Sequence, residues 1–234
     1  MISSPASLDE VLLRQPVWRG AAFVQGAARV VPTGFAVLDR ELPGGGWPGG
    51  ALAEILYARE GIGEMQLVLP ALAALSAAGH RIALIAPPHL PYAPALAAAG
   101  VKLSSLAVVR VSSRLDALWA AEQALRAGAC RAVLVWLGGA RYADLRRLAL
   151  AAEKNQGMGL VFRPAQEAAQ PSSACLRIAL APDAGRVAVE ILKRRGTPAT
   201  RPLRVPLERP VHAVAGGSFS APAARSPAAR PCVA

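Results

Sequence analysis

One segment, residues 51–78, constrains the fold of this chain more than any other. It contains a short apolar run, a glycine-containing loop and a stretch with helical periodicity in direct succession. The run Ala51–Leu56 predicts a buried strand, and the stretch over 64–78 predicts a helix. The loop between them has the length and position of a phosphate-binding loop, which joins a strand to a helix. This strand–loop–helix unit predicts an α/β fold.

The loop departs from the phosphate-binding pattern at the residues that would touch nucleotide. A working loop has the form G-x-x-x-x-G-K-S/T, in which backbone N–H groups and the lysine bind phosphate and the hydroxyl binds Mg²⁺. Here Ala58 replaces the first glycine, Glu64 the lysine and Met65 the hydroxyl, while Gly63 is kept. The carboxylate of Glu64 would repel a triphosphate. On these eight residues alone, an ordinary strand-to-helix turn is the better interpretation.

After the loop, short apolar runs alternate with helix-period segments, which indicates a mostly parallel sheet with helices on both faces. The predicted strands are Ala51–Leu56, Arg81–Ala86, Leu106–Val111, Ala132–Leu137 and Gly159–Phe162, and the predicted helices cover 64–78, 91–99, 114–127 and 142–155. Two final runs, Cys175–Leu180 and Val187–Leu192, flank Pro182, Asp183 and Gly185. Those turn residues predict a C-terminal β-hairpin.

The two ends of the chain have different compositions. Ser7–Gln15 predicts a short helix that Pro16 ends, and Val17–Val24 predicts an extended segment. After residue 200 the chain is rich in proline and isolated arginines, and from 213 onward it cannot bury enough apolar area to offset the backbone entropy of ordering. We therefore divide the chain into an N-terminal docking segment (1–32), an α/β domain (33–200) and a disordered basic tail (201–234).

Composition argues against several classes of protein. Although 53% of the 234 residues are hydrophobic, no stretch approaches the roughly 20 apolar residues of a membrane span, and the start lacks the basic and apolar regions of a signal peptide. The three cysteines and three histidines are scattered without the spacing of a disulfide framework or a metal site. We expect a cytoplasmic protein without metal or membrane.

The positive charge gathers near the C-terminus. From residue 186 onward nine Lys or Arg face two Glu, within a chain that has 26 basic and 15 acidic residues. The run Lys193, Arg194 and Arg195 is the candidate site for nucleic acid or an acidic partner protein. A solvated basic surface explains the same run equally well, because no aromatic residues lie between the basic ones.

Two glycine-containing segments precede the first strand. The first is Thr33–Asp39, and the second is Leu42–Gly50, which reads L-P-G-G-G-W-P-G-G. Together with the loop, they resemble the approach to the ATP site of RecA-like recombinases. In T-G-F-x-x-L-D, P-G-G-G-W-P-x-G and a loop ending G-I-G-E, the chain resembles the ImuA family of translesion-synthesis accessory proteins. That RecA-like family has also been likened to the division inhibitor SulA. The resemblance covers roughly residues 15 to 200, with its motifs in 33–64.

The resemblance implies a RecA-like, doubly wound fold that has lost its ATPase. Pro88 stands at the position of the catalytic glutamate, and Trp136 stands at that of the Mg²⁺-binding aspartate. The segments matching the DNA-binding loops of a recombinase, residues 137–141 and 163–173, are short. We therefore expect a protein without enzymatic activity and without a cofactor.

The resemblance also implies partners: an ImuB-type pseudo-polymerase, an error-prone DnaE-type polymerase and a RecA-like recombinase, with DNA as a further candidate. Trp18 and Phe23 are the implied interface anchors, with ordinary core packing as the alternative. Two other functions stay open. One is a SulA-type division inhibitor that binds the tubulin-like division protein, and the other is a regulator that binds nucleotide without turnover.

Overall fold

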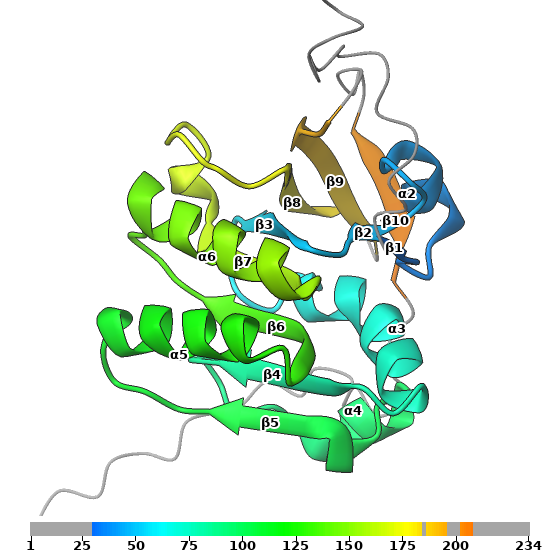
Figure 1. Ribbon diagram of the computed structural model, residues 1–234. Coiled ribbons are helices and arrows are strands. Elements are labelled where there is room, and N and C mark those ends of the chain that lie inside the picture. The colour runs from blue at the N-terminus through cyan, green and yellow to red at the C-terminus, as the bar shows by residue number, and fades with distance from the viewer. Residues whose placement is uncertain (1–29, 184–185, 196–201, 208–234) are drawn as a thin grey trace, which may run out of the picture.

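The computed structural model describes residues 30–183, 186–195 and 202–207. Within them the main feature is an eight-stranded sheet with the order β10-β9-β8-β3-β7-β6-β4-β5 (Figure 1). Its strands are β3 (Ala51–Tyr57), β4 (Arg81–Ile85), β5 (Leu106–Val109), β6 (Cys130–Trp136), β7 (Met158–Pro164), β8 (Leu176–Asp183), β9 (Arg186–Lys193) and β10 (Leu203–Pro206). A separate antiparallel ribbon pairs β1 (Val30–Val31) with β2 (Trp47–Pro48).

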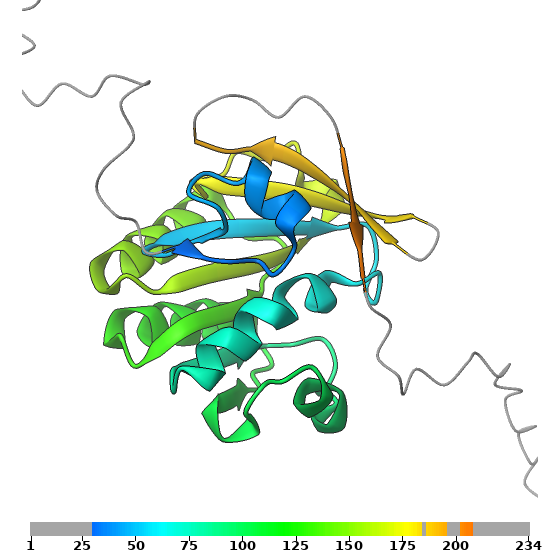
Figure 2. The ribbon, with the colours of Figure 1, turned by 90° about the vertical axis from the view of Figure 1, so that its right-hand side faces the viewer.

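Helices cover both faces of the sheet (Figures 1 and 2). They are α2 (Ala36–Glu41), α3 (Glu64–Ala77), α4 (Ala93–Ala98), α5 (Arg114–Ala127) and α6 (Tyr142–Asn155), with short 3-10 turns at Leu103–Ser105 and Ala165–Glu167. One hydrophobic core lies under α2, α3 and α4, and a second lies under α5 and α6. The predicted helix-covered sheet is confirmed.

Strands β4 to β8 all run parallel to β3. Only the two C-terminal strands, β9 and β10, pair in antiparallel fashion. β3 pairs in parallel with β7 and β8, and β4 pairs in parallel with β5 and β6. β9 pairs antiparallel with β8, so the predicted hairpin is confirmed. Because β3 lies at the centre of the sheet, the loop that follows it opens at the middle of the carboxyl edge.

Local signals in the sequence account for the well-predicted helices. The hydroxyl of Ser113 accepts a hydrogen bond from the backbone N–H of Asp116 at 3.1 Å and caps the start of α5. Gly128 ends α5 with a positive φ of 66°, which glycine adopts without steric cost. Both α5 and α6 have the predicted bounds.

Two elements of the fold were not predicted from the sequence. The short helix α2 begins within the T-G-F-x-x-L-D segment, where Asp39 accepts a hydrogen bond from the backbone N–H of Thr33 at 2.8 Å. Residues 203–206, which we placed in a disordered tail, form β10 and pair antiparallel with β9. Val205 is fully buried there, so alternating apolar residues order a segment whose prolines predict disorder.

Several expectations lie outside the described residues. They are the helix at Ser7–Gln15, the extended segment Val17–Val24 with the candidate anchors Trp18 and Phe23, and the tail from residue 208 onward. Among the residues that the structure describes, no helix is both long and apolar enough to cross a membrane. The same residues contain no group of three or more side chains that could hold a metal ion.

A buried ion network joins the centre of the sheet. Glu54 on β3 accepts hydrogen bonds from Arg163 on β7 and from Arg177 on β8, the latter at 2.6 Å. The side chains of Glu54 and Arg163 are fully buried. Burying charges is unfavourable unless they are paired and hydrogen-bonded, so each of these groups depends on the others.

The network extends into two loops of the carboxyl edge. Arg163 donates to the carbonyl of Ala140 at 2.9 Å and to the carboxylate of Glu167 at 2.7 Å. Glu167 also accepts from the backbone N–H of Gly139 at 2.7 Å. The loops over 137–141 and 163–173 are therefore fixed to each other and to the sheet.

The network predicts a large stability difference between a buried and an exposed ion pair. Glu54→Ala leaves two arginines without their acceptor, so we expect the free energy of unfolding to fall by about 3–5 kcal/mol. Asp183→Ala breaks the pair with Arg204, in which the arginine is exposed, Asp183 is half-buried and the two atoms are 3.2 Å apart, and it should cost less than about 1 kcal/mol. Urea unfolding followed by circular dichroism measures both. Similar small losses in the two variants would contradict this account.

Candidate binding site at the carboxyl edge of the sheet

The loop between β3 and α3 holds its own carboxylate where a phosphate-binding loop holds phosphate. Glu64 is the first residue of α3, and its carboxylate accepts hydrogen bonds from the backbone N–H groups of Gly61 at 2.9 Å and Gly63 at 3.1 Å. Backbone N–H groups at a helix start form an anion-binding site. Because Glu64 is buried, the carboxylate is a fixed part of this loop.

The other positions implied by the resemblance carry no oxygen ligand. Met65 packs against the core beneath α3, and Pro88 lies in the loop after β4. Trp136 ends β6, and its ring stacks on Phe162 with centroids 4.6 Å apart. Mg²⁺ requires oxygen ligands, and none of these three side chains provides one. Ala58, at the position of the first loop glycine, is exposed.

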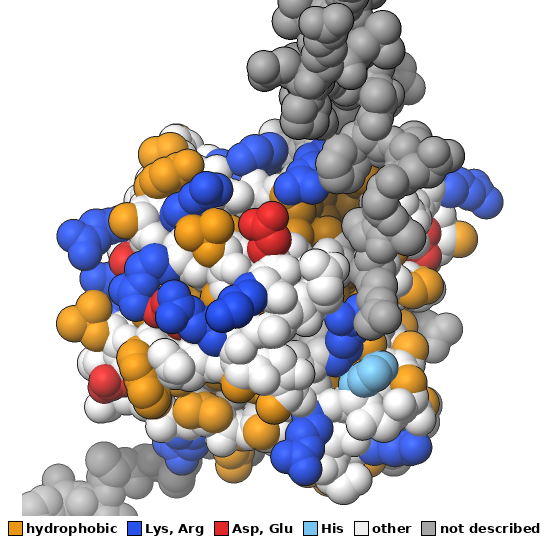
Figure 3. Space-filling view, in the orientation of Figure 1, with side chains coloured by type: hydrophobic (Ala, Val, Ile, Leu, Met, Phe, Trp, Pro, Cys, Tyr) orange, Lys and Arg blue, Asp and Glu red, His pale blue; other side chains and the backbone are white. Residues whose placement is uncertain are grey.

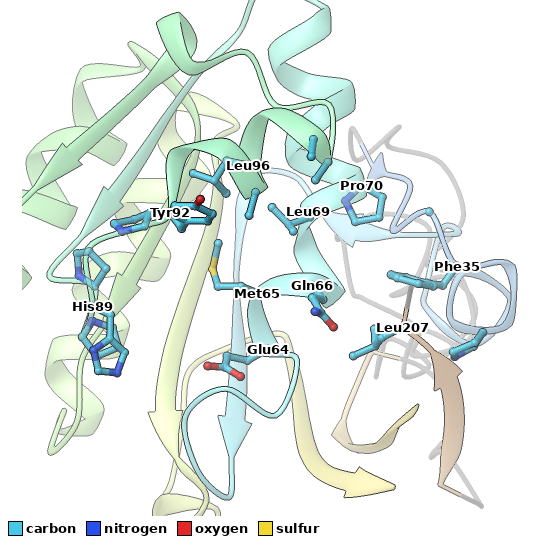
Figure 4. A pocket seen from close by; sticks show the side chains of 18 of the residues that line it. Phe35, Glu64, Met65, Gln66, Leu69, Pro70, His89, Tyr92, Leu96 and Leu207 are labelled. Carbon is cyan, nitrogen blue, oxygen red and sulfur yellow. The ribbon is translucent and has the colours of Figure 1, made fainter. Parts of the chain in front are cut away.

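A pocket of about 980 Å³ opens beside this loop (Figure 4). Its walls come from α2, α3, α4, the loop after β4 and the end of β10, and most of its lining is apolar. Figure 4 labels Phe35, Met65, Leu69, Tyr92, Leu96 and Leu207 around it. Concave, mostly apolar surfaces with a few polar groups are typical binding sites.

A contact between two side chains lies at the rim of the pocket. The imidazole of His89 lies 2.9 Å from the carboxylate of Glu60, and both side chains are exposed. His89 lies in the loop that follows β4. Exposed pairs of this kind contribute about 0–1 kcal/mol, so this one connects two loops without fixing them strongly.

Leu207 covers the loop from the other side, and sequence analysis missed it. Gly63 has a φ of 118°, and a Cβ atom added there would lie 2.2 Å from Leu207 Cδ1 and 3.0 Å from Val187 Cγ2. The backbone conformation therefore favours glycine, and a Cβ atom at this position would displace the end of the Leu207 side chain. The signal was the alternation of Leu203, Val205 and Leu207, which the surrounding prolines obscured.

The basic run at the end of β9 does not form one patch. Lys193 donates to the carbonyl of Ser172 at 2.9 Å, whereas Arg194 pairs with Glu41 of α2 at 3.0 Å. The two side chains thus bind segments from different parts of the fold, and Arg195 is exposed. Binding of DNA or an acidic partner by these three residues stays a prediction.

Comparison with known proteins relates the middle of this chain to a division inhibitor. A family model described as "Cell division inhibitor SulA" matches residues 50–159, from the start of β3 into β7. The crystal structure of SulA from Pseudomonas aeruginosa is 27% identical, with a TM-score of 0.42, and the similarity covers 48% of this chain and 97% of that one. No curated protein matches. The resemblance to the ImuA family stays a prediction.

The contact between Leu207 and the loop predicts unequal effects at two neighbouring glycines. Gly63→Ala combines an unfavourable φ with displacement of the Leu207 side chain, so we expect a loss of about 1–3 kcal/mol of folding stability. Gly61 also has a positive φ, of 76°, but nothing lies within 4 Å of an added Cβ. Gly61→Ala should cost only about 1 kcal/mol. Thermal unfolding tests the order, and equal losses would mean that Leu207 does not seal the loop.

Proposed function

We propose that this protein is a non-catalytic, RecA-related protein of the DNA-damage response that acts by binding other proteins. The observation that carries the proposal is the carboxylate of Glu64 on the N–H groups of Gly61 and Gly63. Because these N–H groups already donate to the Glu64 carboxylate, they are not available to bind phosphate. The apolar pocket beside it offers a surface for protein contact instead.

Electrostatics disfavours nucleotide at this loop. A triphosphate would have to displace the Glu64 carboxylate, which would then remain close to the phosphates. Two like unit charges about 4 Å apart near a protein surface repel by roughly 4 kcal/mol. Met65, Pro88 and Trp136 supply neither a metal ligand nor a base, so nothing among these residues offsets that repulsion.

Calorimetry with Mg-ATP tests the loss of nucleotide binding. We expect no heat of binding at nucleotide concentrations up to about 1 mM, where even a weak site would be filled. We also expect no ATP turnover above background. A dissociation constant in the low micromolar range, or turnover that disappears in Gly63→Ala, would overturn the proposal.

The first candidate for the biological role is division inhibition of the SulA type. It is supported by the family match over residues 50–159, which includes the loop, α3 and the residues after β4. Such a protein would bind the tubulin-like division protein and prevent its polymerisation. Leu90 and Tyr92 are exposed at the pocket and are candidate contacts for that partner.

Light scattering of the division protein with GTP tests this role. Wild-type protein should lower the polymer signal in proportion to its concentration, and the double substitution Leu90→Ala, Tyr92→Ala should weaken inhibition about thirtyfold, as expected for lost interface anchors. Leu103→Ala removes an exposed leucine outside the pocket and serves as the control. Undiminished polymerisation at a molar excess of wild-type protein would exclude this role.

The second candidate is an ImuA-type adaptor in translesion synthesis. It is supported by two motifs that resemble the ImuA family, T-G-F-x-x-L-D and P-G-G-G-W-P, and by the last strands of the sheet, all of which lie outside the residues matched by the SulA model. Leu38 of α2 and Trp47 of β2 are fully buried, and β8, β9 and β10 extend the same sheet. A pull-down from damaged cells distinguishes the candidates. Recovery of an ImuB-type pseudo-polymerase and a DnaE-type polymerase would favour the adaptor, and recovery of the division protein would favour inhibition.

A further inference from the structure

The outer face of α5 and α6 carries large apolar side chains that the core does not use. Leu115 is 63% exposed, Trp119 62%, Tyr142 51% and Leu150 49%. Single exposed apolar residues are common on protein surfaces, but four on two adjacent helices form an unusual concentration. The two helices pack side by side on one face of the sheet (Figure 1).

Arginines accompany these side chains, and a buried carboxylate positions the first pair. The side chain of Glu122 on α5 is only 4% exposed, and it pairs with Arg126 at 2.9 Å and with Arg147 of α6. Both arginine side chains remain more than half exposed. One carboxylate thus orients two arginines, and one positive charge is left unneutralised.

A second buried carboxylate repeats the arrangement near the start of the helices. Asp144 lies 2.8 Å from Arg114 and 3.8 Å from Arg141. Burial alone would raise the pKa of the Asp144 carboxyl, but the hydrogen bond from the Arg141 backbone and the guanidinium of Arg114 lower it below its ordinary value. Asp144 therefore stays ionised and holds both arginines in place.

We propose that the outer face of α5 and α6 binds a partner protein through an acidic amphipathic helix. Apolar residues of that helix would cover Leu115, Trp119 and Leu150, and its carboxylates would meet the guanidinium groups left in excess. Four arginines against two buried carboxylates leave a net charge of +2, which is complementary to an acidic partner. Figure 3 shows basic and apolar side chains interspersed over these helices.

The composition of this face favours protein over nucleic acid. Single-stranded nucleic acid binds grooves of unneutralised positive charge in which aromatic rings stack on bases. Here Glu122 and Asp144 neutralise half of the guanidinium charge, and the face carries Leu115 and Leu150 besides the rings of Trp119 and Tyr142, so stacking on bases would use only part of its apolar surface. Apolar anchors ringed by arginine, with the guanidinium groups held in place beforehand, match a protein interface.

The position of this face makes it independent of the pocket. The pocket is lined by α2, α3 and α4, whereas α5 and α6 cover the opposite face of the sheet (Figure 2). The protein would therefore hold two partners at once, one on each face. The binding role of α5 and α6 does not depend on which partner occupies the pocket.

Three labelled probes test the proposal by fluorescence anisotropy with the full chain. The first is a synthetic helical peptide with leucines on one face and glutamates beside them, the second replaces every glutamate by lysine, and the third is single-stranded oligothymidylate. We expect the acidic peptide to bind at least about tenfold more tightly than its basic counterpart, with affinity falling as salt rises. Binding of the acidic peptide should fall at least about tenfold in Trp119→Ala, Leu150→Ala.

The matched control is Leu90→Ala, Tyr92→Ala, which removes a leucine and an aromatic ring from the pocket and should bind the acidic peptide like wild type. Far-UV circular dichroism checks that both double variants are folded. Equal binding of the acidic and basic peptides, binding of the acidic peptide unchanged in Trp119→Ala, Leu150→Ala, or no binding at about 1 mM would each overturn the proposal. Oligothymidylate binding that disappears in that variant, without peptide binding, would assign the face to nucleic acid.

Discussion

The pairing of Glu54 with Arg163 and Arg177 connects three strands at the centre of the sheet and determines the shape of its carboxyl edge. Through Arg163 and Glu167 the same charges hold the loops over 137–141 and 163–173. These hydrogen bonds restrict both loops, whereas the exposed side chains around them remain available for contact with a partner.

The sequence predicted the parts of the fold that depend on neighbouring residues. The helices α5 and α6 and the strand β3 follow from periodicity and capping, which act over a few residues. The ion network could not be predicted in this way, because Glu54 and Arg163 are 109 residues apart and their pairing depends on strand order. The sequence did not predict strand β10, because the burial of Val205 in the folded protein outweighs the proline-rich composition of the segment.

The candidate site was predicted in outline and missed in its detail. The substitutions at Glu64, Met65, Pro88 and Trp136 were visible in the sequence, and they pointed to lost nucleotide chemistry. The sequence did not reveal that the carboxylate of Glu64 turns back onto the loop. The Glu64 carboxylate, which would repel phosphate, is also a hydrogen-bond acceptor that stabilises the loop. The match to SulA over residues 50–159 includes the Glu64 loop.

The hydrogen bonds of Glu64 give this residue a structural role that a change to the phosphate-binding pattern would remove. Restoring lysine at position 64 would remove the acceptor on which two amides depend and place a cation beside them. Met65 would still provide no oxygen ligand for Mg²⁺, and the Leu207 side chain would still lie close to Gly63. A single substitution toward the phosphate-binding pattern would therefore lower the folding stability without completing a nucleotide site. On the proposed function, this loop is retained as part of a scaffold whose uses need no nucleotide.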